Sequence, residues 1–378
     1  MIKWFFKYGI VFYLLNTILL SIEATFSLGY TIFLLIMTLF CFLILINPKQ
    51  IKLIIFHKAF NFFLLLNFIN VFYWFMFHDF SDYEAGKYLM ARGIQFSIIS
   101  FSIYHNYDYF KEKFLKHLMY SILGIIVLGL IINPYIFSGR YSGLVWNPNM
   151  LSSFSCIAFA ALFLNQKKKT NFEIALLVLF LIISLATGSR GVLIGISLAF
   201  VFKYGLSIRN IIYGLMALSG YFILLNLKLD TSVNRFASQG LLNDRLLQYQ
   251  YAYETVLQKP FFGFGLDKYA YINPEIVPYY LSSHIISAHN SYLAILVQYG
   301  FVFGLFILGI IFYQTIRFFL KVDKNDPGQL FYLYIIIYAI VASFYETLIT
   351  GINEFHTILF WFSFGFLSYS IYKKEYGN

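Results

Sequence analysis

Apolar runs of about 20 residues recur from one end of the chain to the other, and they constrain its fold more than any other feature. Such a run crosses the hydrocarbon core of a bilayer as a helix, and the bilayer admits only helices and closed barrels because backbone polar groups must be satisfied internally. The chain is 60% hydrophobic and only 12% charged, whereas a soluble domain is roughly a quarter charged. We therefore expect an all-α polytopic membrane protein, with residues 1–378 forming a single membrane domain.

Judged by the length of a bilayer span, the runs predict about twelve transmembrane helices. The stretch 172–204 is interrupted only at 187–191, and basic residues lie at both of its ends. Both ends are therefore expected on the cytoplasmic side, so we predict a hairpin of two short helices there rather than one long helix. The expected spans are 4–22, 28–46, 53–77, 88–106, 114–136, 147–165, 172–188, 190–206, 208–227, 287–316, 329–349 and 354–372.

The basic residues predict the orientation of these spans. With the N-terminus inside, 18 of the 27 Lys and Arg residues fall in cytoplasmic loops or ends, as the positive-inside rule requires. We therefore predict that both termini are cytoplasmic. The net charge of +10 is spread over small clusters between apolar runs, a distribution that argues against nucleic-acid binding. Cys41 and Cys156 lie inside apolar runs, which excludes a disulfide framework and a Cys-based metal site.

One connection is far longer than the others. Residues 228–286 lie between the ninth and tenth expected spans, and we predict that they form a large extracytoplasmic loop. Loops of this length are usually functional or disordered, and the many Tyr, Phe and Leu residues argue against disorder. The stretch 243–257 has no Gly or Pro, so we expect a helix at the membrane surface. Pro260, Gly263 and Gly265 would end that helix.

Polar residues at the outer membrane boundary are the candidates for chemistry. Arg190 lies at the tip of the predicted hairpin, where it is either functional or an interfacial side chain that reaches water. Arg245, in the loop helix, would alone be a solvated charge, but two guanidiniums on one face can hold a diphosphate. His289 opens the tenth span and can accept a proton near neutral pH. Asn290, beside it, is a good helix cap.

Arg140, Asn147 and Asn149 lie ahead of the apolar run of the sixth span and would add hydrogen-bonding groups to the same outer face. On physical grounds alone, a structural role explains these residues better than a role in substrate binding. Trp146 is then an interfacial belt residue, and Pro148 begins a helix. The sequence contains no acidic metal-binding motif and no cluster of His ligands, so we expect no metal and no other cofactor.

Four blocks of sequence, in this order, resemble the O-antigen ligase and O-antigen polymerase superfamily. They span roughly residues 135–305. The last block departs from the family pattern after Gly300, because Phe303 stands where a small residue or Tyr is expected. The blocks are Arg140-x-x-Gly143-x-x-x-Asn147-Pro-Asn149, then Ser189-Arg190-Gly191, then Arg245 followed by Pro260-x-x-Gly263-x-Gly265, and His289-Asn290 with Gly300.

The resemblance implies a GT-C-like glycosyltransferase in the inner membrane of a bacterium. It implies an inverting, metal-independent transfer of glycans carried by undecaprenyl diphosphate, with a chain-length regulator and a flippase as further partners. Carried over to this sequence, Arg190 and Arg245 would hold the diphosphate and His289 would activate the acceptor hydroxyl. Further substrate contacts would come from Arg140, Asn147, Asn149 and Asn290.

Three functions remain open from the sequence. We favour a polymerase, which extends one lipid-linked repeat unit with another, over a ligase, which transfers the glycan to a lipid core or a protein. The reasons are the altered ending of the last block and the many loop tyrosines that could stack on two saccharide chains. A flippase would also suit twelve spans, but the long loop breaks any symmetry between halves, and Arg92 is the one clear ionisable residue within a span. The tyrosines are Tyr249, Tyr251, Tyr253, Tyr269, Tyr271, Tyr279 and Tyr280.

Overall fold

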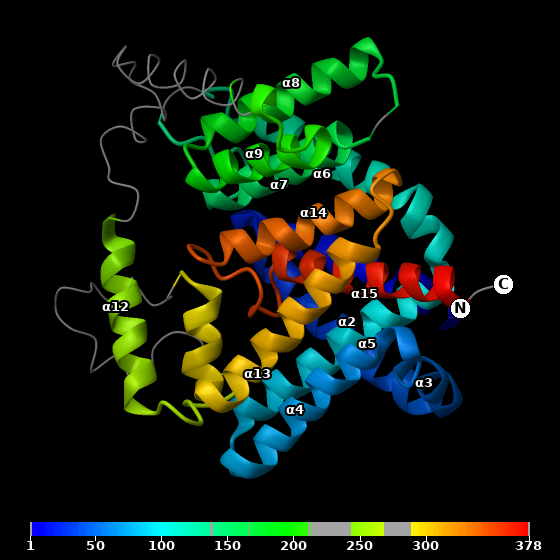
Figure 1. Cartoon of the computed structure of the whole chain (residues 1–378), viewed down its shortest axis with the longest axis vertical. Coiled ribbons are helices and arrows are strands. Elements are labelled where there is room, and N and C mark those ends of the chain that lie inside the picture. The colour runs from blue at the N-terminus through cyan, green and yellow to red at the C-terminus, as the bar shows by residue number, and fades with distance from the viewer. Residues whose placement is uncertain are drawn as a thin grey trace.

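The computed structural model describes residues 2–136, 139–165, 167–210, 212, 243–267 and 289–376. These segments are helical and contain no strand, only an isolated β-bridge between Ile22 and Val145. Figure 1 shows how the helices pack. They are α1 (Ile2–Leu20), α2 (Phe26–Ile46), α3 (Pro48–Ile55), α4 (Asn61–Phe77), α5 (Tyr83–Glu112), α6 (Phe114–Ile132), α7 (Pro148–Phe163), α8 (Asn171–Ala186), α9 (Arg190–Tyr204), α12 (Asn243–Gln258), α13 (Ser291–Lys321), α14 (Pro327–Ala342) and α15 (Phe355–Tyr376).

Every expected span except 208–227, which lies almost entirely outside the described residues, overlaps one of these helices. Several boundaries differ from the expected ones, and two of these differences bear on the fold. The 53–77 span is divided into α3 and α4 by a turn at His57, and α14 ends at Ala342 rather than at 349. The stretch 172–204 forms two helices, α8 and α9, as predicted, and both pack against α7. The helix expected over 243–257 is confirmed as α12.

Four helical segments of the described chain are long and apolar enough to cross a bilayer: Glu23–Ile46, Lys58–Phe77, Phe114–Ile132 and Ser291–Lys321. Shorter apolar helices are Pro148–Phe163, Asn171–Ala186, Gly191–Tyr204 and Pro327–Ala342. The outer faces of the long helices carry exposed apolar side chains, including Leu35, Phe68 and Ile131. Large exposed apolar surfaces of this kind are typical of contact with lipid. These features fit an all-helical polytopic membrane protein.

Helix α15 forms the centre of the molecule. It packs against α1, α5, α13 and α14, and its residues from Phe355 to Ile371 are buried on nearly every side. A helix that is apolar all round is one that neighbouring helices enclose. Aromatic contacts fill this core, with ring centroids 5.0 Å apart for Phe110 and Phe362 and 4.3 Å apart for Tyr332 and Phe366. The short helix α12, in contrast, lies at the periphery beside α13 (Figure 1).

Helix α13 is broken at Gly300, which has φ +66° and ψ −174°. The segment that follows α12 packs its backbone against this break. The amides of Phe264 and Phe301 donate to the carbonyls of Val297 and Pro260 over 2.9 and 2.6 Å. A Cβ atom on Gly263 would lie 2.5 Å from the Gly300 nitrogen, so both positions require glycine. This contact fixes α12 against α13.

Two side chains of α4 and its C-terminal turn strengthen the same junction. The Tyr73 hydroxyl donates to the Phe262 carbonyl at 2.5 Å and lies 3.0 Å from the Gln298 carbonyl. Nε2 of His78 accepts the Leu266 amide proton over 3.1 Å, and Nδ1 of His78 contacts Asp82 at 2.7 Å. The segment after α12 is therefore held by α4 as well as by α13.

Candidate active site

Side chains from three segments converge at the N-terminal end of α13. Nη2 of Arg245, on α12, donates to Oε1 of Glu346 over 2.7 Å. Nδ1 of His289, directly before α13, lies 3.1 Å from Oε2 of the same carboxylate. Nη1 of Arg245 also donates to the Tyr345 carbonyl. The Arg245 and Glu346 side chains are 24% exposed and that of His289 is 36% exposed, so a substrate can reach all three.

The charge of Glu346 determines how His289 is protonated. Burial would by itself raise the pKa of Glu346, but the hydrogen bond with His289 and the charge of Arg245 outweigh it and lower that pKa below its ordinary value. Glu346 is therefore ionised at neutral pH, and an ionised carboxylate only accepts hydrogen bonds. Nδ1 of His289 must then be the donor, which puts the lone pair of the neutral ring on Nε2.

The segment after α14 positions Glu346 through bonds to the start of α13. The Ser291 amide donates to the Ser343 carbonyl over 2.9 Å, and the Ser291 hydroxyl donates to the Glu346 carbonyl over 3.1 Å. Asn290 caps α13, since its Oδ1 accepts from the amides of Tyr292 and Leu293 at 2.9 and 3.1 Å. In the structure Asn290 therefore acts as the N-terminal cap of α13.

His289 has a backbone conformation that side chains rarely adopt. Its φ is +41°, the one positive φ among the non-glycine residues in the described segments. Residues held in this left-handed region cost about 1–3 kcal/mol and cluster at functional sites. The capping by Asn290 at the next position and the contact with Glu346 hold His289 in this conformation.

The Ser189-Arg190-Gly191 block also lies close to the cluster of Arg245, His289 and Glu346. Helix α9 begins at Arg190, and a Cβ atom on Gly191 would lie 3.4 Å from the ring and hydroxyl of Tyr345. Tyr345 directly precedes Glu346, so the start of α9 lies beside the cluster. The side chain of Arg190 is outside the described part of the chain.

The Arg140-to-Asn149 block supports the turn between α8 and α9. Nε of Arg140 donates to the Thr187 carbonyl over 3.2 Å, and Nη2 donates to Oδ1 of Asn149 over 2.6 Å. Oδ1 of Asn147 accepts from the Asn149 amide at 2.9 Å and so caps α7. This block joins the start of α7 to the turn that precedes Arg190, which gives its polar side chains a structural role.

The middle of the chain matches a known protein family. Residues 175–309, about a third of the chain, fit the family described as O-antigen ligase. This segment of the chain is therefore similar to the O-antigen ligase family. The matched segment contains Arg190, Arg245 and His289, and the family implies a glycosyltransferase-like activity on a lipid-linked oligosaccharide in the inner membrane. A search of curated proteins gives no significant match.

Glu346 is the residue of this cluster that the sequence patterns missed. Glu346 falls inside the expected span 329–349, because the apolar run continues to Ile349. The signal that could have found it is an acidic residue at the same outer boundary as His289 and Arg245, since a charge near the bilayer tends to be paired. His284 and the tyrosines from 269 to 280 lie outside the described residues.

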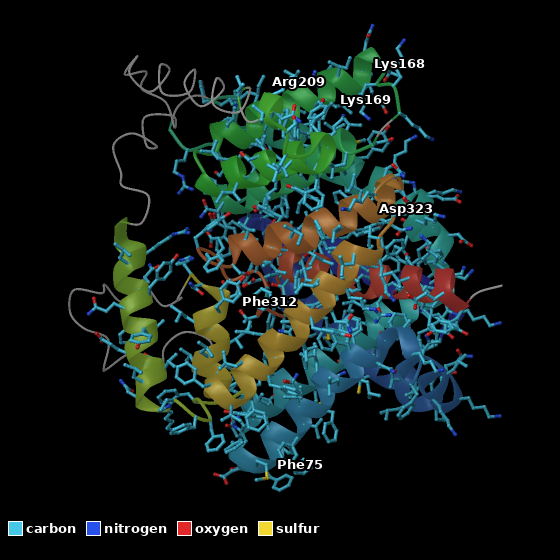
Figure 2. All side chains as sticks on the ribbon, viewed as in Figure 1. Phe75, Lys168, Lys169, Arg209, Phe312 and Asp323 are labelled. Carbon is cyan, nitrogen blue, oxygen red and sulfur yellow. The ribbon has the colours of Figure 1, made fainter. Side chains whose placement is uncertain are left out.

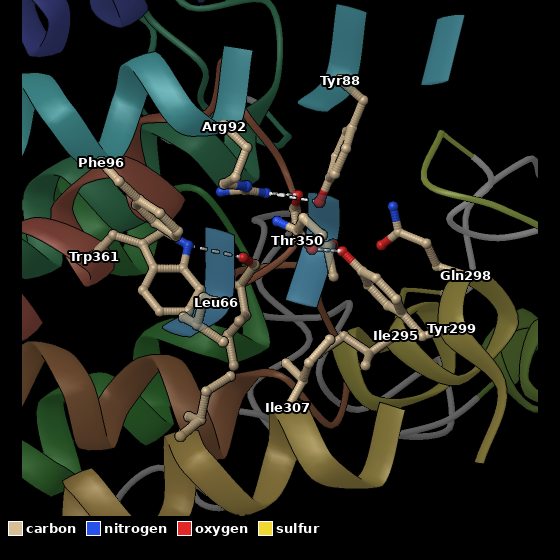
Figure 3. A pocket seen from close by; sticks show the side chains of 13 residues that line it. Leu66, Tyr88, Arg92, Phe96, Ile295, Gln298, Tyr299, Ile307, Thr350 and Trp361 are labelled. Carbon is tan, nitrogen blue, oxygen red and sulfur yellow. Dashed lines mark hydrogen bonds between the residues drawn. The ribbon is translucent and has the colours of Figure 1, made fainter. Parts of the chain in front are cut away.

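Arg92, a buried cation of α5, has a structural role. It donates to Oε1 of Gln95 over 2.7 Å, to the Tyr88 hydroxyl over 3.3 Å and to the Thr350 carbonyl. These bonds join α5 to the segment before α15. The cavity beside Arg92, drawn in Figure 3, has a volume of about 40 Å³. That volume holds a few water molecules, so a glycan could not enter it.

The described segments contain no group of three or more His, Cys, Asp or Glu side chains placed to hold a metal ion. The site is instead a histidine and an arginine bridged by one carboxylate. Such a set can hold an anionic leaving group and accept a proton.

Proposed function

We propose that the protein is a polysaccharide polymerase of the inner membrane. It transfers a glycan from undecaprenyl diphosphate to the non-reducing-end hydroxyl of another lipid-linked repeat unit. One observation carries this proposal: Arg245 and His289 meet through Glu346, with the start of α9 alongside. A cation for the leaving group and a base for the acceptor therefore contact the same carboxylate.

In the proposed reaction Nε2 of His289 takes the proton of the acceptor hydroxyl while that oxygen attacks the anomeric carbon. The bond between this carbon and the diphosphate oxygen breaks, and undecaprenyl diphosphate leaves with the electron pair. Attack opposite the leaving group inverts the configuration at the anomeric carbon. Arg245, together with Arg190, stabilises the negative charge that develops on the diphosphate, and no metal is needed in this scheme.

The arrangement of the loops supports an extracytoplasmic site. In the common view of Figures 1 and 2, both termini, Lys168, Lys169 and the Asp323 turn lie to one side of the molecule, and α12 lies at the other side. The side with the termini, Lys168 and the Asp323 turn carries basic clusters typical of cytoplasmic loops. With the N- and C-termini inside, α12 and the cluster around Glu346 would face the space outside the cytoplasm, where the lipid-linked repeat units would be joined.

A ligase would use the same groups with a different acceptor, and the matched family is itself described as O-antigen ligase. The proposal is tested by analysing surface and lipid-linked glycans on gels from a strain that lacks the gene. We expect the long-chain ladder to collapse to a single repeat unit. Chains of normal length accumulating on the lipid carrier would make the protein a ligase, and unchanged glycans would exclude both activities.

Complementation links the activity to the site. We expect the wild-type gene to restore the ladder and Arg245→Ala to leave it collapsed, because the diphosphate loses its guanidinium. Lys87→Ala is the matched control, since Lys87 is an exposed cation paired with Glu84 at 2.8 Å and expected on the same membrane face. Immunoblots of membrane fractions should show equal amounts of each variant. A restored ladder with Arg245→Ala would contradict the assignment of the site.

A further inference from the structure

Glu346 is bonded to both groups that the proposed reaction uses, through different oxygen atoms. Oε1 accepts from Arg245 at 2.7 Å, and Oε2 lies 3.1 Å from Nδ1 of His289. The proposed reaction assigns Glu346 no step, although its charge acts on both partners. A carboxylate in this position resembles the partner that orients a catalytic histidine in hydrolases.

We propose that Glu346 is a positioning residue that holds His289 in the tautomer with a proton-accepting Nε2 and fixes the guanidinium of Arg245 beside it. This inference rests on the proposed function. Glu346 touches neither substrate in this scheme and acts through its two partners. A single carboxylate thereby sets the distance between the cation for the leaving group and the base for the acceptor.

The backbone around Glu346 is held firmly enough for this role. The Tyr249 hydroxyl donates to the Phe344 carbonyl over 2.6 Å, and Nδ2 of Asn290 donates to the same carbonyl over 3.2 Å. The Leu348 amide donates to the Ser291 hydroxyl over 2.9 Å. Bonds from α12 and from the start of α13 therefore flank Glu346 on both sides and limit where its carboxylate can lie.

The pairing leaves Arg245 able to bind a diphosphate. Its guanidinium donates to Oε1 of Glu346 and to the Tyr345 carbonyl, and a guanidinium has further N–H donors in the same plane. The guanidinium also lies over the Tyr345 ring, 5.7 Å from its centroid. Glu346 therefore orients this cation without using all of its hydrogen-bonding capacity.

During transfer His289 becomes an imidazolium, which the neighbouring carboxylate stabilises. Glutamine at position 346 would remove this charge. Its amide could also donate to Nδ1, which would place the ring proton on Nε2 and abolish the base. The surrounding titratable or charged groups whose charge acts on Glu346 or His289 are Arg245, Tyr249, Tyr338, Tyr345, Glu354 and His356.

Glu354 provides the matched control among these groups. Burial raises the pKa of Glu354 to about 7, so this carboxyl titrates in the same pH range as an imidazole. It accepts a hydrogen bond from the Thr357 hydroxyl over 3.3 Å, and it bonds to neither His289 nor Arg245 in the described structure. Glu354→Gln therefore makes the same chemical change in the same connecting segment without touching the base.

The test is the pH dependence of chain extension by the purified full-length protein in lipid nanodiscs, with undecaprenyl-diphosphate-linked repeat units as substrate. We expect Glu346→Gln to lower kcat by about 10²-fold or more and to move the acidic limb of the profile to lower pH. Glu346→Asp keeps the negative charge, so it should keep the wild-type acidic limb at a reduced rate. Glu354→Gln should retain most of the activity.

The possible results separate this inference from the proposed function. A wild-type protein that transfers no glycan to any acceptor would overturn the proposed function. An active wild type with a Glu346→Gln variant of equal kcat and unchanged pH profile would overturn the role of Glu346 alone. A uniform loss at every pH would also overturn it, because a merely structural role gives that result. If Glu346→Gln elutes as aggregate, the profile of Glu346→Asp decides: a displaced acidic limb contradicts the proposal.

Discussion

Gly300 and Gly263 are positions where two backbone segments approach too closely for a side chain. The φ of +66° and ψ of −174° at Gly300 belong to a region that essentially only glycine occupies. A Cβ atom there would overlap the carbonyl of Phe261. The two glycines therefore allow the segment after α12 to bond to the broken helix α13, and through it they help to place Arg245.

Alanine at position 300 should destabilise the protein strongly. We expect Gly300→Ala to cost about 1–3 kcal/mol for the backbone conformation alone, with the overlap at Phe261 adding to it. Gly309→Ala is the matched control, because Gly309 is in the same helix and a Cβ there meets nothing within 4 Å. Thermal unfolding in detergent, followed by fluorescence-detected size exclusion, measures both variants. Equal melting temperatures would show that the junction does not need glycine at 300.

At the scale of elements, α12 is held at both ends, by α13 at one end and by the segment after α14 at the other. The Pro260–Gly265 segment bonds to the break at one end, while Arg245 and Tyr249 bond to residues 344–346 at the other. The hydroxyl of Tyr73 adds a bond from α4 to the first of these junctions. The distance from the break to the start of α13 thus sets where Arg245 lies relative to His289.

Removing the Tyr73 hydroxyl should loosen α12 without unfolding the helices around it. A lost hydrogen bond with a buried acceptor left unpaired costs about 1–3 kcal/mol. We expect Tyr73→Phe to increase amide hydrogen exchange over 260–266 and to raise the KM for the lipid-linked substrate. Tyr313→Phe, at an exposed position of α13, is the control. Unchanged exchange in Tyr73→Phe would mean that the backbone bonds alone hold the junction.

The elements also show what the sequence could and could not predict. Run length and the glycine and proline positions were enough to predict the helices, including α12, because local composition decides where a helix can form. The break at Gly300 and the end of α14 at Ala342 were not predicted, since apolar residues continue through both positions. These features arise from contacts between distant segments. Glu346 was missed for the same reason, because its partners His289 and Arg245 are 57 and 101 residues away in the sequence. His289 and Arg245 themselves were identified as candidates.

At the scale of the whole molecule, the two termini and the basic Lys168 and Asp323 loops lie to one side and α12 to the other (Figures 1 and 2). The helices α13, α14 and α15 connect these sides. This separation fits the proposed orientation, with the two ends of the chain on the cytoplasmic side and the cluster around Glu346 on the outer side.

Cysteine labelling tests that assignment. In a chain with Cys41→Ala and Cys156→Ala, we expect Lys259→Cys to react with a membrane-impermeant maleimide in intact spheroplasts. Lys168→Cys should react only after the membrane is permeabilised, because its loop is cytoplasmic by the positive-inside rule. The labelled bands are read on gels after purification. The reverse pattern would invert the topology and place the cluster around Glu346 in the cytoplasm.

Because α12 is held at its two ends, the sequence of its exposed face is free to vary. Leu246, Tyr253 and Leu257 are exposed on α12 and share one face of the helix by their spacing. None of them contributes to the backbone bonds between the Pro260–Gly265 segment and α13. Replacing this stripe would change the exposed surface of α12 without removing the hydrogen bonds that join Arg245 and His289 to Glu346. The outer face of α12 can therefore vary in sequence while the arginine and the histidine keep their separation.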